Sequence, residues 1–97
     1  MSLYRQGMKH AQRHDHQRAI ADYTCVIDMT AVPADLRSMA LYNRALVYDA
    51  LEDTPHAMAD LRVVLDMPGV TTQVRTEAHR KLVRMERTFG RAESRES

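Results

Sequence analysis

The sequence predicts an all-α fold made of two repeated units and a closing helix. Residues 19–29 align without gaps on residues 57–67, and six of the eleven aligned positions are identical. Apolar residues inside this block recur at helical spacing, and no stretch alternates apolar and polar residues with a period of two. Alanine, leucine and methionine, which favour helices, supply most of the apolar residues.

A single 38-residue offset, the step from residue 19 to residue 57, relates the whole chain to itself, and we call it the repeat offset. Within the block the identical pairs are Ala19/Ala57, Ala21/Ala59, Asp22/Asp60, Val26/Val64, Asp28/Asp66 and Met29/Met67. Beyond the block the matching pairs are Val32/Val70, Arg37/Arg75 and Ala40/Ala78, and upstream Gly7 falls opposite Ala45. Because the 97-residue chain is longer than two such periods, we expect two complete units and the first half of a third.

The first unit should contain helices at about 2–13 and 16–29. Asp15 lies between them, in the position from which it caps the second helix. Four apolar residues of that helix fall at i, i+4, i+7 and i+8 and therefore share one buried face: Ala19, Tyr23, Val26 and Ile27. Pro33 follows this helix and separates the two units.

The second unit should contain helices at about 35–51 and 55–66. The sequence Asp-Thr-Pro at 53–55 is a helix-start signal, because a capping side chain and a proline in the first turn both suit that end of a helix. The apolar spacing of the first unit then recurs in Ala57, Leu61, Val64 and Leu65. A Pro-Gly pair at 68–69 ends the unit.

A fifth helix at about 72–89 should close the array. Its apolar residues make one continuous stripe, formed by Val74, Ala78, Leu82, Met85 and Phe89. Its basic residues make another, formed by Arg80, Arg84, Arg87 and Arg91. At about 100° per residue, Leu82 and Arg84 point roughly 200° apart, so one face is predicted to be buried and the opposite face to be cationic.

We expect one domain at residues 1–90, followed by a disordered tail at 91–97. Repeat 1 spans about 2–33, repeat 2 about 34–70, and the capping helix about 71–89. The tail is polar and has no apolar residue that would anchor it to the domain.

Charge and cysteine content narrow the class of protein. A net charge of +1 excludes the uniform positive field of a non-specific nucleic-acid binder. Apolar runs reach only three or four residues, far below the roughly 20 that span a bilayer, and the first residues lack a signal-peptide pattern. Cys25 is the only cysteine, so we expect a cytoplasmic protein in which this residue is packed or half-packed in a helix.

The repeated helix pairs resemble tetratricopeptide repeats. The residues that carry the resemblance are Gly7, Ala19, Tyr23 and Pro33 in the first unit and Ala45, Tyr48, Ala57, Leu61 and Pro68 in the second. The most specific fragment is YNRALVY at 42–48, and the length of the repeat is similar to that of a bacterial subgroup with longer repeats. This resemblance implies a right-handed superhelix of antiparallel helix pairs. His10 and Val83 depart from the pattern, because the family places an aromatic and a small residue there; the last helix is therefore interpreted as a cap.

The resemblance also implies a binding groove, because the first helix of each pair lines a concave surface in this family. The corresponding residues are Tyr4, Met8, Gln12, Met39, Tyr42, Asn43, Leu46, Asp49, Arg80, Lys81, Arg84 and Arg87. Apolar side chains beside arginines suit a peptide or protein with an acidic segment or a C-terminal carboxylate. Alternatively, the arginines only solubilise the helix, helped by pairing of Glu77 with Lys81. The carboxylate clamp of chaperone-binding relatives is matched only at Asn43 and Lys81, and Asn43 could instead serve a structural role.

Other functions are less well supported by the sequence. The exposed apolar residues expected on the groove could be covered by a second copy of the chain, so a homodimer is an alternative. An RNA-binding helical repeat is a further alternative, based on the basic last helix. His10, His14 and His16 have metal-ligand spacing but are interpreted as surface residues around a helix corner. No enzymatic motif is present, so we expect neither catalysis nor a cofactor.

Overall fold

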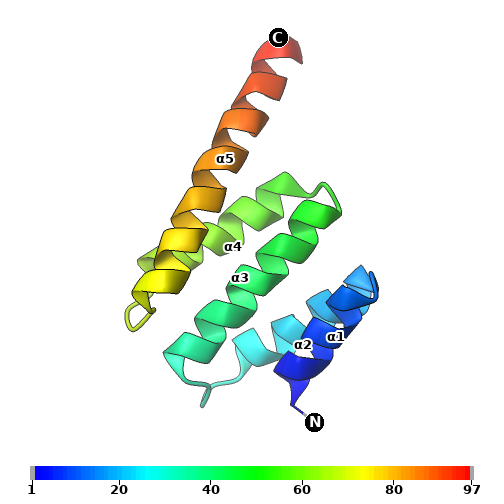
Figure 1. Ribbon diagram of the computed structural model, residues 1–97, viewed down its shortest axis with the longest axis vertical. Helices are drawn as coiled ribbons and strands as arrows, with labels where there is room; N and C mark the ends of the chain where they lie inside the picture. The colour runs from blue at the N-terminus through cyan, green and yellow to red at the C-terminus, as the bar shows by residue number, and fades with distance from the viewer. Residues whose placement is uncertain (1, 97) are drawn as a thin grey trace.

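The computed structural model describes the backbone of residues 2–96 and the side chains of residues 2–90. Five α-helices follow one another in this part of the chain: α1 (Leu3–Gln12), α2 (His16–Asp28), α3 (Ala34–Ala50), α4 (Thr54–Asp66) and α5 (Thr72–Glu96) (Figure 1). The described residues contain no strand, so the all-α prediction is confirmed. None of the described helices is both long enough and apolar enough to cross a membrane.

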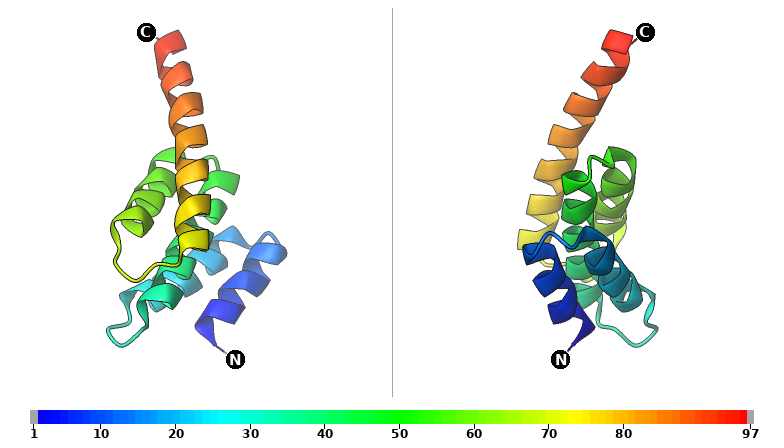
Figure 2. Two further views of the ribbon diagram at one scale, coloured as in Figure 1. Left: turned by 60° about the vertical axis from the view of Figure 1, so that its left-hand side comes forward. Right: turned by 90° about the vertical axis from the view of Figure 1, so that its right-hand side faces the viewer.

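Each helix packs against the next one in the chain, and α3 also contacts α1 and α5. The helices α1, α3 and α5 therefore form one side of the molecule, and α2 and α4 lie behind them (Figures 1 and 2). The second half of α5 projects beyond the other helices in all three views. The central helix α3 is thus the only one of the five that contacts all the others within the described chain.

The repeat offset is visible in the hydrogen bonds between the units. The guanidinium group of Arg37 donates to the carbonyl oxygens of Ile27, at 3.1 Å, and Met29. Arg75 is the repeat equivalent of Arg37, and it donates to the repeat equivalents of those two carbonyl oxygens, Leu65 at 2.6 Å and Met67 at 3.1 Å. Equivalent arginines therefore satisfy the carbonyl groups left free at the C-terminal ends of α2 and α4.

The corners inside the two units are also equivalent. His14 and Glu52, which the repeat offset relates to each other, both have a φ of 61°. Asp15 and Asp53 follow, and each side chain accepts a hydrogen bond from the backbone N–H three residues on, which caps α2 and α4. The repeat therefore extends from side-chain identity to backbone conformation.

Each unit is closed by a tight contact between its two helices. Gly7 of α1 lies so close to Tyr23 of α2 that an added Cβ would be 2.7 Å from Cε1 of the ring. In the second unit Ala45 and Leu61 occupy these places, and both are fully buried. In each unit a small residue of the first helix thus faces a larger residue of the second helix. The pairs Gly7/Tyr23 and Ala45/Leu61 fill the space between the two helices of their units with different combinations of side chains.

Two apolar clusters make up the core. The first joins α2 to α3 through Ala19, Tyr23, Val26, Ala40 and Val47. The second joins α3, α4 and α5 through Leu41, Ala45, Ala57, Met58, Leu61, Val64, Ala78, Leu82 and Met85. Three residues of the predicted apolar stripe of α5 are thus buried, and the other two, Val74 and Phe89, pack against the cluster.

A buried ion pair connects three helices. Arg44 of α3 forms two hydrogen bonds with the carboxylate of Asp60 in α4, at 2.7 and 2.8 Å. A third nitrogen of the same guanidinium donates to Thr24 Oγ1 in α2, at 2.9 Å. The hydrogen bonds with Asp60 raise the pKa of Arg44 and keep it charged although its side chain is only 17% exposed. This arginine therefore joins the first unit to the second.

Two expectations differ from the structure. Helix α5 continues past the predicted end at residue 89 to Glu96, because Gly90 is followed by alanine, arginine and glutamate, which favour helix. The side chains of the tail predicted at 91–97, and all of residue 97, lie outside the described residues. Cys25 is exposed and not packed, as is its repeat equivalent Val63, which is 48% exposed, because both face away from the neighbouring helices.

Candidate functional site

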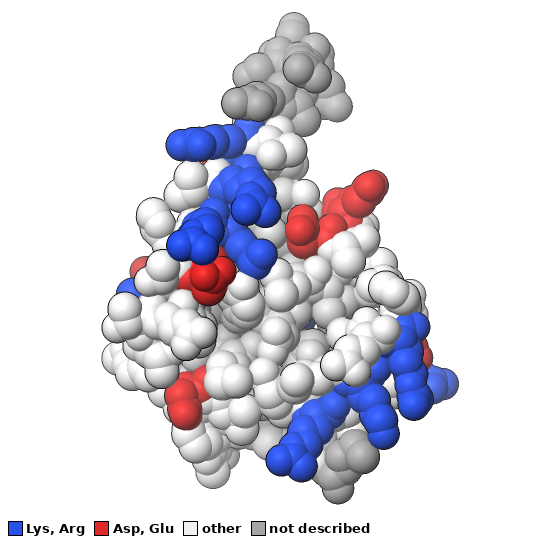
Figure 3. Space-filling view, viewed as in Figure 1, with Lys and Arg blue, Asp and Glu red and all other residues white. Residues whose placement is uncertain are grey.

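The side of the molecule formed by α1, α3 and α5 has a distinct charge pattern. Figure 3 shows basic side chains gathered over α5 and over α1, with a largely uncharged surface between them. Among the side chains that the structure describes, the exposed lysines and arginines on these helices are Arg5, Lys9, Arg80, Arg84 and Arg87. The uncharged band follows the middle of α3, where Met39 is 38% exposed, and the exposed Asp35 and Asp49 lie near the two ends of that helix.

A pocket of about 230 Å³ lies where the three helices meet. Its lining residues are Tyr4 from α1, Met39, Tyr42 and Asn43 from α3, and Gln73, Val74 and Glu77 from α5. Four of these residues were predicted for the groove, and the structure brings them together. We refer to this site as the central pocket.

Two polar groups of the central pocket are already paired with each other. The side-chain nitrogen of Asn43 donates a hydrogen bond to the hydroxyl oxygen of Tyr4, at 2.6 Å. Burial raises the pKa of Tyr4, and the bond from Asn43 partly opposes that rise. Asn43 therefore fixes the position of α1 against α3, which is a structural role, while it also lines the pocket.

The hydroxyl group of Tyr42 is neutral at physiological pH. Burial raises its pKa first, the negative charge of Glu77 raises it further, and the positive charge of Arg80 lowers it. A neutral phenol both donates and accepts hydrogen bonds. The pocket thus combines the apolar side chains of Met39 and Val74 with a hydroxyl group that can bond to a donor or to an acceptor of a ligand.

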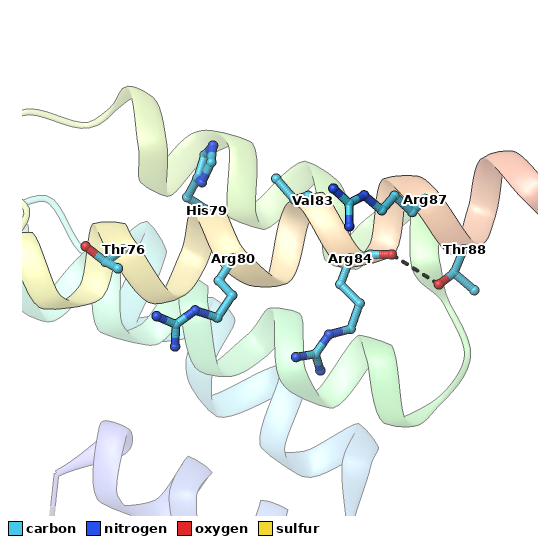
Figure 4. A pocket seen from close by; sticks show the side chains of 7 residues that line it. All are labelled: Thr76, His79, Arg80, Val83, Arg84, Arg87 and Thr88. Atoms are coloured by element: carbon cyan, nitrogen blue, oxygen red, sulfur yellow. Dashed lines mark hydrogen bonds between the residues drawn. The ribbon is translucent and has the colours of Figure 1, made fainter.

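The other predicted residues, except Leu46, lie in three further hollows. On α1 the lining residues are Arg5, Met8, Lys9 and Gln12. Where α5 passes α3 and α4, they are Asp49, Thr54, Lys81, Arg84, Met85 and Thr88. On the far side of α5 they are Thr76, His79, Arg80, Val83, Arg84, Arg87 and Thr88 (Figure 4). Leu46 is half-buried on α3.

The structure therefore divides the predicted cations between two faces of α5. Lys81 points toward α3, where it shares a hollow with Asp49. Arg80 and Arg87 line the far side, and Arg84 borders both hollows. This division follows from helix geometry, because Lys81 and Arg87 are six residues apart and point roughly 120° away from each other.

Three residues of the central pocket were not predicted: Gln73, Val74 and Glu77. Val74 was assigned to the buried stripe, and Glu77 was expected to pair with Lys81. In the structure Glu77 pairs with Arg80, at 3.1 Å. The repeat offset contained the missing signal, because it places Gln73, Val74 and Glu77 on the helix that follows α1 and α3 in the array.

The histidine cluster is dispersed by the fold. Nδ1 of His10 lies 2.7 Å from a carboxylate oxygen of Asp22 in α2, so this histidine is engaged inside the first unit. His14 lies beyond the end of α1, and its ring centre is 5.9 Å from that of His16. Within the described residues no group of three His, Cys, Asp or Glu side chains is placed to hold a metal ion.

Comparisons of this chain with protein-family models, with curated proteins and with solved structures find no match.

Proposed function

We propose that this protein is an adaptor module of tetratricopeptide type, whose helix pairs form a right-handed superhelix and whose side of α1, α3 and α5 binds a partner peptide. The observation that supports this most directly is the meeting of Tyr4, Met39, Tyr42 and Asn43 in the central pocket. The equivalent arginine bonds and corners of the two units support the repeat assignment.

The proposed ligand has an apolar anchor next to acidic groups. Met39 and Tyr42 offer apolar surface to the anchor, because methionine adapts to many shapes and a tyrosine ring is large and stiff. Lys9 and Lys81 lie on the helices at either side of α3 and offer positive charge to the acidic groups. The proposed site excludes a strongly basic peptide for the same reason.

We propose binding and not catalysis, because three polar residues of the central pocket already form a hydrogen bond or an ion pair. Asn43 is bonded to Tyr4 and Glu77 is paired with Arg80. A general acid or base needs a group free to exchange a proton with a substrate.

Selection of 12-residue peptides from a random phage-displayed library tests the proposal. Peptides that bind the wild-type chain should carry acidic residues beside an aromatic or aliphatic residue. Met39→Glu should weaken their binding by about tenfold or more, because it places a carboxylate beside the anchor and opposite the acidic groups. Fluorescence anisotropy with labelled peptide measures the dissociation constant.

Met29→Glu is the matched control, since Met29 is similarly exposed, at 43%, but lies at the end of α2. It should leave the affinity unchanged. Equal binding by the two variants, or a selection that yields only basic peptides, would contradict the proposed groove.

Self-association through the same side is the second candidate function. Met8 and Met39 are 39% and 38% exposed on this side, and a second copy could cover both. Sedimentation velocity at micromolar concentration distinguishes the two. A dimer that Met39→Glu converts into a monomer would favour self-association, and a monomer throughout would remove it.

A further inference from the structure

Helix α5 occupies the place of the first helix of a third unit. The repeat offset carries Gly7 onto Ala45, and a second step of the same length carries Ala45 onto Val83. In both completed units this position faces the second helix of the pair. Gly7 touches Tyr23 of α2, and Ala45 shares a buried cluster with Leu61 of α4.

The face of α5 around Val83 has no such helix within the described chain. Ser38 and Leu41 of α3 are 1% and 3% exposed, and Leu41 shares a buried cluster with residues of α4. Their repeat equivalents on α5, Thr76 and His79, are both exposed. The buried residues of α5 lie on the opposite face. Other helices therefore cover α5 on one side only within the described chain, whereas they cover α3 on two sides.

The uncovered face forms a hollow of about 530 Å³, lined by Thr76, His79, Arg80, Val83, Arg84, Arg87 and Thr88. We call it the outer face of α5. In Figure 4 Arg80 and Arg84 extend in the same direction from the helix, and His79 lies on the other side of it. Arg80 and Arg84 therefore lie to one side of the half-buried Val83, and His79 lies to the other.

The charge of the outer face is unbalanced. Arg80, Arg84 and Arg87 are exposed. The acidic residues of the same stretch of helix are Glu77, which pairs with Arg80, and Glu86, which is exposed. The hydroxyl group of Thr88 donates a hydrogen bond to the backbone carbonyl oxygen of Arg84 in the same helix. Arg84 and Arg87 have no acidic partner within 4.0 Å among the described side chains.

We propose that the outer face of α5 docks an acidic amphipathic helix of a partner protein. A helix fits beside His79 and Val83, because α4 packs in one buried cluster with their repeat equivalents Leu41 and Ala45. Arg80, Arg84 and Arg87 border this part of the face, at the repeat positions of Tyr42, Leu46 and Asp49. An acidic helix fits because guanidinium groups bind carboxylates in two-pronged hydrogen bonds. The same face of a second copy is excluded as the occupant, because it would bring two rows of arginines together. The outer face shares no lining residue with the central pocket, and the two surfaces are connected by the ion pair of Arg80 with Glu77.

Two synthetic peptides derived from α4 test the proposal. Both contain residues 53–67, which pack against the equivalent face of α3. The acidic peptide carries His56→Glu and Arg62→Glu, and the basic peptide carries Asp60→Lys and Asp66→Lys. Each is titrated into isotopically labelled full-length protein, and chemical-shift changes in two-dimensional NMR spectra locate the contact.

The acidic peptide should bind more tightly than the basic peptide and should cause its largest chemical-shift changes between Thr76 and Thr88. Its affinity should fall as salt is added. Arg80→Glu combined with Arg87→Glu should reduce its affinity by about tenfold or more, and should favour the basic peptide instead. Met39→Glu should leave its affinity unchanged, which separates this surface from the central pocket.

Several results would overturn the proposal. These are equal affinity for the two peptides, shifts that map to the central pocket, and acidic-peptide binding that survives the double charge reversal. A dimer in sedimentation velocity that the double variant abolishes would assign the face to a second copy. Binding of single-stranded RNA to this face, without binding of the acidic peptide, would assign it to nucleic acid.

Discussion

Replacing Gly7 with alanine tests whether close packing of α1 on α2 explains this glycine. The new Cβ would lie 2.7 Å from Cε1 and 2.9 Å from Cδ1 of Tyr23, whereas carbon atoms pack best at roughly 3.5–4.0 Å. Tyr23 is 1% exposed, so its ring has little room to move. Overpacking of this kind costs about 1–3 kcal/mol, and alanine returns about 1 kcal/mol through its helix propensity. We expect the free energy of unfolding to fall by about 1 kcal/mol in total.

Tyr23→Leu provides the second arm of a double-mutant cycle, because Leu61 faces Ala45 at the equivalent place of the second unit. In that background the clash is absent, and Gly7→Ala should stabilise the protein by up to about 1 kcal/mol. The coupling energy of the cycle should therefore be about 2 kcal/mol. Urea unfolding followed by far-ultraviolet circular dichroism measures all four proteins.

Gly90→Ala is the matched control, because no atom lies within 4 Å of a Cβ added at Gly90. This variant should lose no stability. The packing explanation is refuted if Gly7→Ala alone stabilises the protein, or if it has the same effect with tyrosine and with leucine at position 23.

Two further predictions concern buried polar groups. Asp60→Ala should lower the free energy of unfolding by about 3 kcal/mol, because it leaves the guanidinium of Arg44 buried without its partner; a loss below about 1 kcal/mol in urea unfolding would contradict this. Burial, then the charges of Tyr4 and Asp22, raise the pKa of Tyr23 from 10.0 to about 12. The unfolded chain therefore loses this proton first, and stability should fall as the pH rises from about 10 through 12. Tyr23→Phe should flatten that decline in unfolding curves measured across this range, and an equally steep decline would contradict the assignment.

The capping residues and prolines predicted the helices, because each of these signals acts on a few neighbouring residues of the chain. Asp15 and Asp53 cap the helices that they were expected to precede, and Pro33 stands at the start of α3. The end of α5 was missed because the polar residues at the end of the chain were interpreted as a tail, and polar residues can continue a helix that needs no buried face.

The contacts of the site depend on residues far apart in the chain, which explains why the sequence did not predict them. Asn43 bonds to Tyr4 across 39 positions. The pairing of Arg44 with Asp60 was also missed, because its repeat equivalents are Gln6 and Asp22, and Asp22 is bonded to His10 instead. Identical residues at equivalent repeat positions thus predict the same backbone conformation. Their side chains nevertheless bond to different partners.

The two neighbours Asn43 and Arg44 connect the stability of the array to its proposed binding surface. They are adjacent on α3, and their side chains point about 100° apart around the helix. Asn43 reaches Tyr4 on α1, and Arg44 reaches Asp60 on α4 and Thr24 on α2. Loss of the ion pair would free α3 to shift, and the central pocket depends on where α3 holds Tyr42. Asp60→Ala should therefore also weaken peptide binding, although Asp60 is 6% exposed and lies outside the pocket. Outer-face binding should change less, because that hollow is lined by α5 alone.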